Sequence, residues 1–514
     1  MKIISKFAGA LTLLGGLGML CAGPAGASTN SVRVTTTDQL IAAINAAERT
    51  HTPTQINVTA GHYVFTQMFN STYGPNGLPN VTTQISIIGA DPTTTILDLG
   101  GNNNFSTPRF FTVLPSGNLA LRNLTLTGGG GEGACQGFGQ DCSEMGGGAV
   151  LNIRGVLTIT NCALSGNSAI TGENLGPLYG GAIESVSGIL TIDETTIEGN
   201  TAEGNGGGVA LLGGSASISR SIITGNTLYT GQLFDGSFFG LVGGGIFVSS
   251  GDLTVDSSTI SGNFAGLTPS DQFNIYGLGG GIYNGGTVLL TNSAVVDNQV
   301  LDYGEGAGIF NSGGMKIENS TIANNVAGTA AGGIFNTHDL LLQGVTLTNN
   351  SAEGNIIFGT FNPYPAFPAN CYFGSTLPCD VSGNGLHSDP GANTQVATSV
   401  LANNNGSDCD GVVISDGHNA LGNDAGCTWT KSASLNGHAT YDQINVNPML
   451  GAIQDNGAAG NAHYSPLPGS PLIDAGGAIG TYCTPLDQLG HRRVGIANRD
   501  AWSICDVGAI EYQP

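Results

Sequence analysis

Residues 146–167 read GGGAVLNIRGVLTITNCALSGN, and variants of this stretch recur along the middle of the chain. Each copy has small residues before an aliphatic residue, and an asparagine sixteen or seventeen residues after that aliphatic. The aliphatic residues are Val150, Ile183, Val209, Ile246, Ile282, Ile309 and Ile334. The asparagines are Asn167, Asn200, Asn226, Asn263, Asn298, Asn325 and Asn350. A self-similar period of 25 or more residues is typical of a solenoid, in which stacked repeats share one continuous core.

Within the quoted stretch apolar and polar residues alternate, which predicts half-buried strands. Leu157 and Ile159 flank Thr158, and the same alternation returns at Leu190 and Ile192 in the next copy. Glycine-rich junctions allow the chain to turn sharply between short strands. Three short strands per coil, stacked in parallel about 4.8 Å apart, predict an all-β fold: a single-stranded right-handed parallel β-helix.

Three columns of like residues are expected along such a solenoid. The recurring asparagines predict a ladder at one corner, in which each amide bonds the next coil. A second, broken column contains Asn123, Asn161, Asn292 and Asn319, and a third contains Cys162, Thr195, Ser221, Ser258, Ser293 and Ser320. We interpret these columns as structural rather than ligand-binding, and Cys162 as a buried thiol rather than a nucleophile.

The chain is expected to divide into five segments. Residues 1–27 form a signal peptide, 28–110 the N-terminal cap and first coils, 111–350 the regular repeats, 351–450 irregular coils with loops, and 451–514 a C-terminal module. Leu40, Ile41 and Ile44 give residues 38–47 an apolar helix face, so we expect this helix to cover the first coil. The disulfide-rich C-terminal module is expected to close the other end, because a solenoid needs both ends covered.

The first 27 residues have the organisation of a secretory signal peptide. They contain Lys2 and Lys6, an apolar run through Leu20, and small residues up to Ala27. The apolar run is too short and glycine-rich to span a bilayer well, and no later stretch reaches about 18 apolar residues. We therefore expect a secreted or cell-surface protein without a membrane span.

The charge of the chain restricts its partners, since 13 basic residues stand against 36 acidic ones. A surface this negative repels nucleic acid and anionic lipid. It also disfavours an anionic polysaccharide unless a cation such as Ca²⁺ bridges the two. We expect a monomer that requires no other cofactor.

Nine of the ten cysteines follow the signal peptide. Four close pairs are candidate disulfides, which would pin loops in an oxidising compartment. They are Cys135 with Cys142, Cys371 with Cys379, Cys409 with Cys427, and Cys483 with Cys505. None of these spacings is accompanied by histidines in the pattern of a zinc site.

Several short motifs mark the C-terminal part of the chain. They are residues 417–422 (GHNALG) between Cys409 and Cys427, then 447–451 (NPMLG), 455–457 (DNG), 469–476 (GSPLIDAG) and 505–511 (CDVGAIE). These motifs resemble the choice-of-anchor Q domain. The Gly-Gly-Ile-Phe-Asn and Gly-Gly-Ile-Tyr-Asn repeats resemble those of polymorphic outer-membrane proteins and of the pectate-lyase-like β-helix group. The resemblance covers most of residues 110–514 and implies a secreted or cell-surface β-helix protein of bacterial type, with no particular reaction. Because the chain stops at Pro514 without a following anchor, we expect a freely secreted product.

Length variation is concentrated between each ladder asparagine and the next coil. Loops at one edge of a rigid solenoid are favourable places for a binding site. The aromatic residues there are Tyr179, Tyr229, Phe234, Phe238, Phe239, Phe264, Phe273, Tyr276 and Tyr303, accompanied by Glu173, Asp235, Asp271, Asp302 and Glu305. Aromatic faces beside carboxylates suit sugar rings, so we predict that an extended polysaccharide or cell-surface glycan binds there. In the alternative interpretation the phenylalanines form small cores of the loops.

A possible catalytic column lies on outward strand positions. Asp193, Arg220 and Asp256 fall on three successive coils, with Glu194 beside the first. Carboxylates flanking an arginine could neutralise a uronate and abstract a proton, as in a polysaccharide lyase. Ordinary salt bridging between coils explains the same residues.

Whether the protein is an enzyme stays open at this level. A lyase is favoured over a glycoside hydrolase, because the paired Asp-Asp and the Gly-His-Gly of β-helix pectin hydrolases are absent from the sequence. An adhesin or interaction scaffold is a third possibility.

Overall fold

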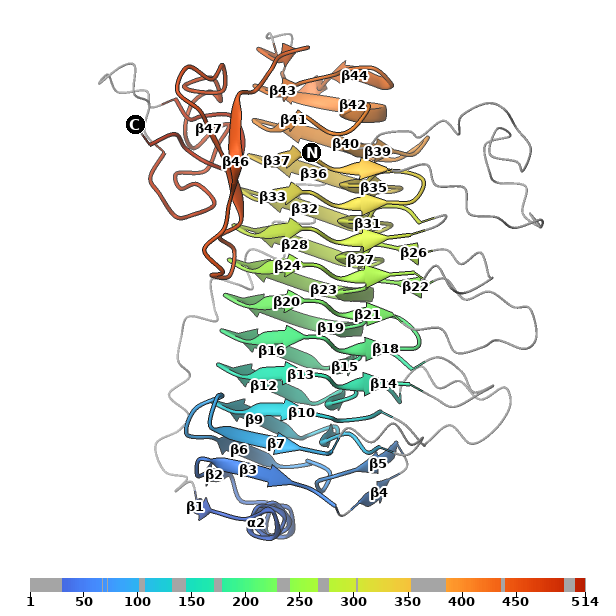
Figure 1. Cartoon of the computed structure of the whole chain (residues 1–514), viewed down its shortest axis with the longest axis vertical. Coiled ribbons are helices and arrows are strands. Elements are labelled where there is room, and N and C mark those ends of the chain that lie inside the picture. Colours follow the sequence, from blue (N-terminus) through green and yellow to red (C-terminus); the bar gives the residue numbers. More distant parts are fainter. Residues whose placement is uncertain are drawn as a thin grey trace, which may run out of the picture.

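The computed structural model describes residues 30–66, 68–71, 73–100, 107–131, 145–170, 178–228, 241–266, 277–301, 304–352, 385–435, 440–493 and 504–513. The coils stack along the long axis of the molecule (Figure 1). Helix α2 (Thr37–Thr50) lies at one end, and β42 (Cys409–Gly417), β43 (Ala420–Leu421) and β44 (Cys427–Lys431) lie at the other. All pairings between successive coils in the three long sheets are parallel, as in β12 (Val156–Thr160) with β16 (Ile189–Asp193) and β13 (Ala163–Ser165) with β17 (Thr196–Glu198). The expected right-handed parallel β-helix is confirmed.

Among the described residues the largest sheet has 21 strands and contributes two strands, or one long strand, to each regular coil. Its strands are β1 (Asn30–Val34), β2 (Thr54–Val58), β6 (Gln84–Ile88), β8 (Phe111–Val113), β9 (Asn118–Arg122), β11 (Val150–Ile153), β12 (Val156–Thr160), β15 (Ile183–Val186), β16 (Ile189–Asp193), β19 (Val209–Ser219), β23 (Ile246–Asp256), β27 (Ile282–Asn284), β28 (Thr287–Thr291), β31 (Ile309–Asn311), β32 (Gly314–Glu318), β35 (Ile334–Asn336), β36 (Asp339–Gln343), β39 (Leu386–Ser388), β40 (Asn393–Ala397), β42 (Cys409–Gly417) and β44 (Cys427–Lys431).

Two further long sheets complete the coil. The 13-stranded sheet contains β3 (Gly61–Val64), β7 (Thr95–Asp98), β10 (Thr125–Thr127), β13 (Ala163–Ser165), β17 (Thr196–Glu198), β20 (Ile222–Thr224), β24 (Thr259–Ser261), β29 (Ala294–Val296), β33 (Thr321–Ala323), β37 (Thr346–Thr348), β41 (Val400–Ala402), β43 (Ala420–Leu421) and β45 (Gln443–Ile444). The 7-stranded sheet contains β14 (Ser168–Ala169), β18 (Thr201–Ala202), β21 (Thr227–Leu228), β25 (Phe264–Ala265), β30 (Gln299–Val300), β34 (Val326–Ala327) and β38 (Ser351–Ala352). Short pairs are β4 (Phe69–Ser71) with β5 (Gly74–Asn76), β22 (Leu241–Val242) with β26 (Gly277–Leu278), and β46 (Leu450–Gln454) with β47 (His463–Pro466).

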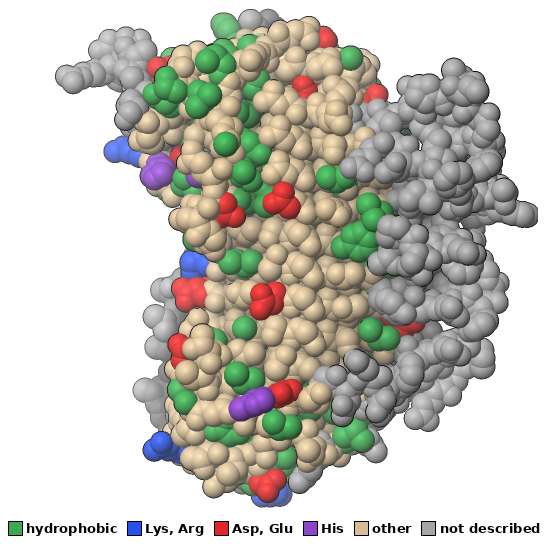
Figure 2. Space-filling view, in the orientation of Figure 1, with side chains coloured by type: hydrophobic (Ala, Val, Ile, Leu, Met, Phe, Trp, Pro, Cys, Tyr) green, Lys and Arg blue, Asp and Glu red, His purple; other side chains and the backbone are tan. Residues whose placement is uncertain are grey.

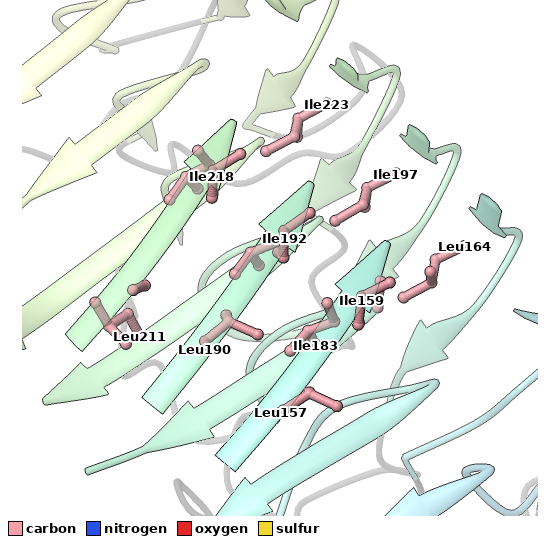
Figure 3. Close-up of a cluster of buried hydrophobic side chains, with 14 of the residues drawn as sticks. Leu157, Ile159, Leu164, Ile183, Leu190, Ile192, Ile197, Leu211, Ile218 and Ile223 are labelled. Carbon is pink, nitrogen blue, oxygen red and sulfur yellow. The ribbon is translucent and has the colours of Figure 1, made fainter. Parts of the chain in front are cut away.

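The core lies inside the coil and consists of aliphatic ladders. Leu157 is in register with Leu190, and Ile159 with Ile192, so like side chains stack along the axis. Figure 3 shows these residues beside Leu164 and its neighbours from the 13-stranded sheet, all directed into the same interior. They are essentially fully buried. Apolar and polar residues therefore alternate in the sequence because alternate side chains of each strand face the interior of the coil, as the period of two residues predicted.

The asparagine ladder is continuous and buried. The backbone N–H of Asn167 and its side-chain Nδ2 both donate to Oδ1 of Asn200, at 2.9 and 3.0 Å. The same pair of bonds recurs from coil to coil as far as Asn350, which donates to Asn404. Asn404 in turn donates to Asp408, whose carboxylate ends the ladder. The structural interpretation of these asparagines is confirmed.

A hydroxyl ladder runs through the column that begins at Cys162. Each hydroxyl accepts a backbone N–H from the preceding coil, as from Cys162 N to Thr195 Oγ1 at 3.3 Å and from Thr195 N to Ser221 Oγ at 3.1 Å. Cys162 itself is a free, buried cysteine, as expected. The column of Asn161 and Asn292 has left-handed backbone conformation, with φ near +50°. Asparagine tolerates this conformation better than most residues, which accounts for its recurrence at that corner.

Helix α2 (Thr37–Thr50) covers the N-terminal end of the core. Its N-cap Thr36 accepts a hydrogen bond from Gln39 N, and Leu40, Ile44 and Ala47 are buried. Glu48 then accepts backbone N–H groups from Thr82 and Thr83, which ties the helix to the first coils. The predicted helix is confirmed and extends three residues beyond Ala47.

The C-terminal module does not close the far end but runs back along the side of the coils. The loop between β46 and β47 carries Gly460, whose N–H donates to Thr259 Oγ1 on β24, far from β45 in the strand order of that sheet. Tyr464 packs on outward residues of β29 and β33 and bonds Asn324 at 2.8 Å. The cause is the apolar outer face of the 13-stranded sheet, where Ala294, Val296 and Ala323 need cover.

Two of the four candidate disulfides lie in described residues, and both are formed. Cys409 with Cys427 joins β42 to β44 in the last coils, and Cys483 with Cys505 lies within the C-terminal module. The other two predicted bridges fall outside the described residues and stay predictions: Cys135 with Cys142, and Cys371 with Cys379.

Candidate functional site

The insertions follow the strands of one sheet, as the spacing predicted. The 7-stranded sheet contains β14, β21, β25, β30 and β38, and the undescribed residues 171–177, 229–240, 267–276, 302–303 and 353–384 follow within two residues of them. Most of the predicted sugar-binding aromatics lie outside the described residues: Tyr229, Phe234, Phe238, Phe239, Phe273, Tyr276 and Tyr303. The same is true of Glu173, Asp235, Asp271 and Asp302. Tyr179, Phe264 and Glu305 are described.

A column of aromatic rings lies along this edge, on the outer face of the 21-stranded sheet. Phe247, Tyr283, Phe310 and Phe335 are in register on four successive coils. Each follows directly after the isoleucine that starts its coil, in GGGIF, GGGIY, GAGIF and GGIF. The aromatic residue after each isoleucine could have predicted this column from the sequence. We assigned these positions to the structural repeat and therefore did not select them as site residues.

Most of the column cannot offer ring faces to a ligand. The centroids of Tyr283 and Phe310 are 5.5 Å apart with an interplanar angle of 2°, and those of Phe310 and Phe335 are 5.1 Å apart at 7°. Rings stacked in this way cover one another's faces. Phe310 and Phe335 are buried, and so is Phe247, whereas Tyr283 is partly exposed. The stacked part of the column is therefore structural.

The column opens where its rings are no longer stacked. Ala210 occupies the register position between Glu184 and Phe247, and it is fully buried in a cluster with Val242 and Phe247 against which Tyr179 packs. The neighbouring rings are tilted instead of stacked: Tyr179 lies 5.8 Å from Phe247 at 58°, and Phe247 lies 5.5 Å from Tyr283 at 37°.

A pocket of ≈340 Å³ lies at this opening. It is lined by Tyr179, Glu203, Gly204, Asn205, Leu241, Val242, Phe247, Ser249, Tyr283 and Gly285. Asn205 is held by accepting the N–H of Val242 at 3.2 Å. Gly204 is required for space, because a Cβ there would lie 2.4 Å from the ring of Tyr179. The pocket thus combines aromatic and apolar walls with hydroxyl, amide and carboxylate groups, and its volume lies at the small end of the range for ligand sites.

A titratable cluster ends the aromatic column. The ring centroid of His387 lies 4.5 Å from that of Phe335. Its Nε2 bonds Asp389 at 3.0 Å, and its Nδ1 lies 2.8 Å from a carboxylate oxygen of Asp410 in an ion pair. Burial lowers the pKa of His387, but the hydrogen bonds and charges of the two aspartates outweigh it, so that its pKa is raised. Burial raises the pKa of nearby Glu305 to about 7, and the negative charge of Asp389 adds to this while His387 opposes it. Both ring nitrogens face carboxylates, which favours the charged imidazolium over the neutral ring.

The structure brings together only part of the predicted catalytic column. Arg220 forms ion pairs with Asp193 and, at 3.3 Å, with Glu194, and its side chain is 54% exposed. The carboxylate of Asp256 instead accepts hydrogen bonds from Thr291 at 2.7 Å and from Asn292 at 2.8 Å, on the next coil. Asp193 and Asp256 are both in register with Ser219, and the guanidinium of Arg220, one residue further along, pairs with Asp193 on the preceding coil. Arg220 is therefore already neutralised by two carboxylates.

Potential metal ligands do not cluster in the described ranges. Within them no group of three or more His, Cys, Asp or Glu side chains is arranged to hold a metal ion. The bridging Ca²⁺ considered above therefore stays a prediction. No helix in this part of the chain has the length and apolarity needed to cross a bilayer.

Comparison with known families gives a match over part of the chain. The model of the right-handed beta helix region matches residues 111–328. That range contains the aromatic column as far as Phe310 and the pocket beside Tyr179. No curated protein and no solved structure matches the chain.

Proposed function

We propose that this chain is a secreted glycan-binding β-helix protein, and that the pocket beside Tyr179 holds one ring of an extended polysaccharide. The observation that carries the proposal is the pocket itself, where the rings of Tyr179, Phe247 and Tyr283 are tilted instead of stacked and line one cavity. Tyrosine rings suit the C–H faces of a sugar, and Glu203, Asn205 and Ser249 suit its hydroxyls.

The charge of the protein favours a neutral glycan over an acidic one. The formal net charge is −23, and Glu203 lines the pocket without a lysine or arginine among the other described lining residues. On the face drawn in Figure 2 the described basic side chains are few and lie near its margin. An anionic polymer would therefore approach an unfavourable potential.

Secretion is part of the proposal. It is supported by the signal-peptide pattern of residues 1–27 and by the two disulfides in the C-terminal region, since disulfides persist in oxidising compartments. Cys409, Cys427 and Cys505 lie in or beside the motifs that resemble the choice-of-anchor Q domain. We include membership of that group in the proposal. Fractionation of the native host tests secretion, and recovery of uncleaved protein from the cytoplasm would refute it.

Lyase activity is not favoured by the geometry of Arg220, because that residue has no unpaired charge to offer a uronate.

The test of binding is a panel of neutral and acidic oligosaccharides, titrated by calorimetry. Tyr179→Ala is expected to weaken binding about tenfold. Tyr441→Ala is the matched control, because Tyr441 is 68% exposed on the last coils and away from the pocket. Equal binding by both variants would contradict the proposal, and so would retention on cells with no binding to any glycan.

A further inference from the structure

A second concave site lies between the C-terminal module and the corner of the solenoid that carries Asn292 and Asn319. It is a groove of ≈680 Å³. Its solenoid wall contains Ser257, Thr291, Asn292, Glu318 and Asn319, and its other wall contains Ala458–Asn461 and Thr484–Gly490. The groove and the pocket beside Tyr179 share no lining residue. Phe247 of the pocket lies at the start of β23 and Ser257 of the groove just beyond its end, so the two sites are separate.

The module wall of the groove is held rigidly against the coils. Gln488 is buried and donates to the carbonyls of Gly460 and Ala462, both at 2.9 Å, while it accepts from Thr321 at 2.7 Å. Gly460 approaches the solenoid so closely that a Cβ would lie 2.7 Å from the backbone of Ser257. The groove therefore exists before any ligand arrives, which lowers the entropic cost of binding.

Asp256 orients the solenoid wall. Its carboxylate accepts hydrogens from Thr291 Oγ1 at 2.7 Å, from Asn292 Nδ2 at 2.8 Å and from Ser257 Oγ at 3.0 Å. All three donors line the groove. Because their hydrogens point to Asp256, the hydroxyl oxygens and the amide oxygen of Asn292 face outward mainly as acceptors.

The charges around the groove are negative or already paired. Lys316 bonds Glu318 at 2.5 Å, and Asp487 accepts backbone N–H groups from Leu489 and His491. No lysine or arginine is among the described residues that line the groove. An anion would find no cation among them, whereas a ligand with many hydroxyl donors would find acceptors. Ala458, Pro485 and Leu486 add an apolar strip suited to the C–H face of a sugar ring.

We propose that this groove is a second binding site for a neutral, hydroxyl-rich saccharide, with Asp256 as a positioning residue and Thr291 and Asn292 as contacts. The proposal does not depend on the pocket beside Tyr179. A protein with two separate saccharide sites would bind two segments of one polymer, or two polymers, and gain avidity.

The test uses the full chain carrying Tyr179→Ala, so that only the groove is measured. Linear oligosaccharides of glucose, mannose and galactose are titrated by calorimetry, with oligogalacturonate as the acidic counterpart. We expect one neutral series to bind and oligogalacturonate to bind less well. Ala458→Trp places a large ring at an exposed position of the groove wall and is expected to abolish binding.

Two valine variants distinguish the loss of a contact with the saccharide from a general effect on folding. Thr291→Val removes one acceptor oxygen and should weaken binding about threefold to tenfold. Thr160→Val is the matched control, because Thr160 occupies the same column of the same sheet outside the groove. Unchanged binding in Ala458→Trp, equal loss in both valine variants, preference for oligogalacturonate, or no binding to any neutral series would each overturn the proposal.

Discussion

Asn226 gives both its backbone N–H and its side-chain Nδ2 to a single acceptor, Oδ1 of Asn263, at 3.0 and 2.9 Å. Asn263 repeats the arrangement with Asn298. Each ladder residue is thus acceptor for the coil before it and donor to the coil after it, with every bond buried. A ladder of this kind fixes the position of each coil relative to its neighbours.

Replacing Asn263 with alanine should therefore be strongly destabilising. It leaves two buried donors of Asn226 without an acceptor, at a cost of about 1–3 kcal/mol each. Urea unfolding followed by circular dichroism measures the change. Thr158→Ala, on the outer side of β12, is the control and should cost less than about 1 kcal/mol. Comparable effects of the two substitutions would show that the ladder contributes little.

Arg493 is expected to hold the C-terminal module on the solenoid. It is buried and donates to Asn319 at 3.2 Å on the coil side, and to Glu511 at 3.4 Å within the module. Arg493→Met removes the buried cation that faces the carboxylate of Glu511, which costs about 3–5 kcal/mol. Limited proteolysis should then cut residues 446–513 first. Arg492→Met, at an exposed neighbour, should leave the digestion pattern unchanged.

Glu305 should make stability fall as the pH rises. Its pKa is raised from 4.5 to about 7 by burial, so the folded state holds a proton that the unfolded state releases. Unfolding free energy is therefore lost between about pH 4.5 and pH 7, by at most about 3 kcal/mol. Glu305→Gln should match the wild type in melting temperature near pH 4.5 and exceed it near pH 8. Parallel melting curves across this range would contradict the prediction.

The thiol of Cys162 should be unreactive in the folded protein. Burial raises its pKa to about 11, so very little thiolate forms near neutral pH. Alkylation followed by peptide mass mapping should find Cys162 unmodified under native conditions and modified in denaturant. Native modification at a rate typical of free cysteine would place this coil in frequent exchange with an open state.

A larger side chain at Ala210 should disrupt the pocket beside Tyr179. Ala210 is fully buried in a cluster with Phe247 and Tyr179, so Ala210→Phe would force these two pocket-lining rings out of place. Glycan binding at this site should be lost. A melting curve recorded in parallel reports the cost of packing the larger side chain, which is about 1–3 kcal/mol when a buried site is overfilled. Retained binding in a folded variant would move the site elsewhere.

The repeat was enough to predict the fold, because its period and its alternation of apolar and polar residues determine contacts within one coil and between adjacent coils. The spacing of Asn167 and Asn200, for example, determines a hydrogen bond between adjacent coils. It also located the insertion corner correctly. The position of the C-terminal module could not be predicted in the same way. Gly460 contacts Ser257 through the backbone, about 200 residues away in the chain, and no repeat in the sequence relates the two residues.

The candidate sites were predicted only in part. Tyr179 was selected by its loop, and it does line a pocket. The contribution of Phe247 and Tyr283 to the same pocket is visible only once the coils are in register. Asp256 was selected as an acid beside Arg220, but Arg220 pairs with Asp193 and Glu194 on the preceding coil. Asp256 accepts hydrogen bonds from Thr291 and Asn292 on the following coil instead.

The asparagine ladder also has a consequence for how this protein can change. Its hydrogen bonds fix the position of each coil relative to the next one just before each insertion begins. This position does not depend on the length of the insertion. Segments such as 229–240 and 267–276 can therefore be exchanged as cassettes without shifting the coils above or below them. Under the proposed function, recognition at this edge would be modular, and new segments could be grafted there while the solenoid stays the same.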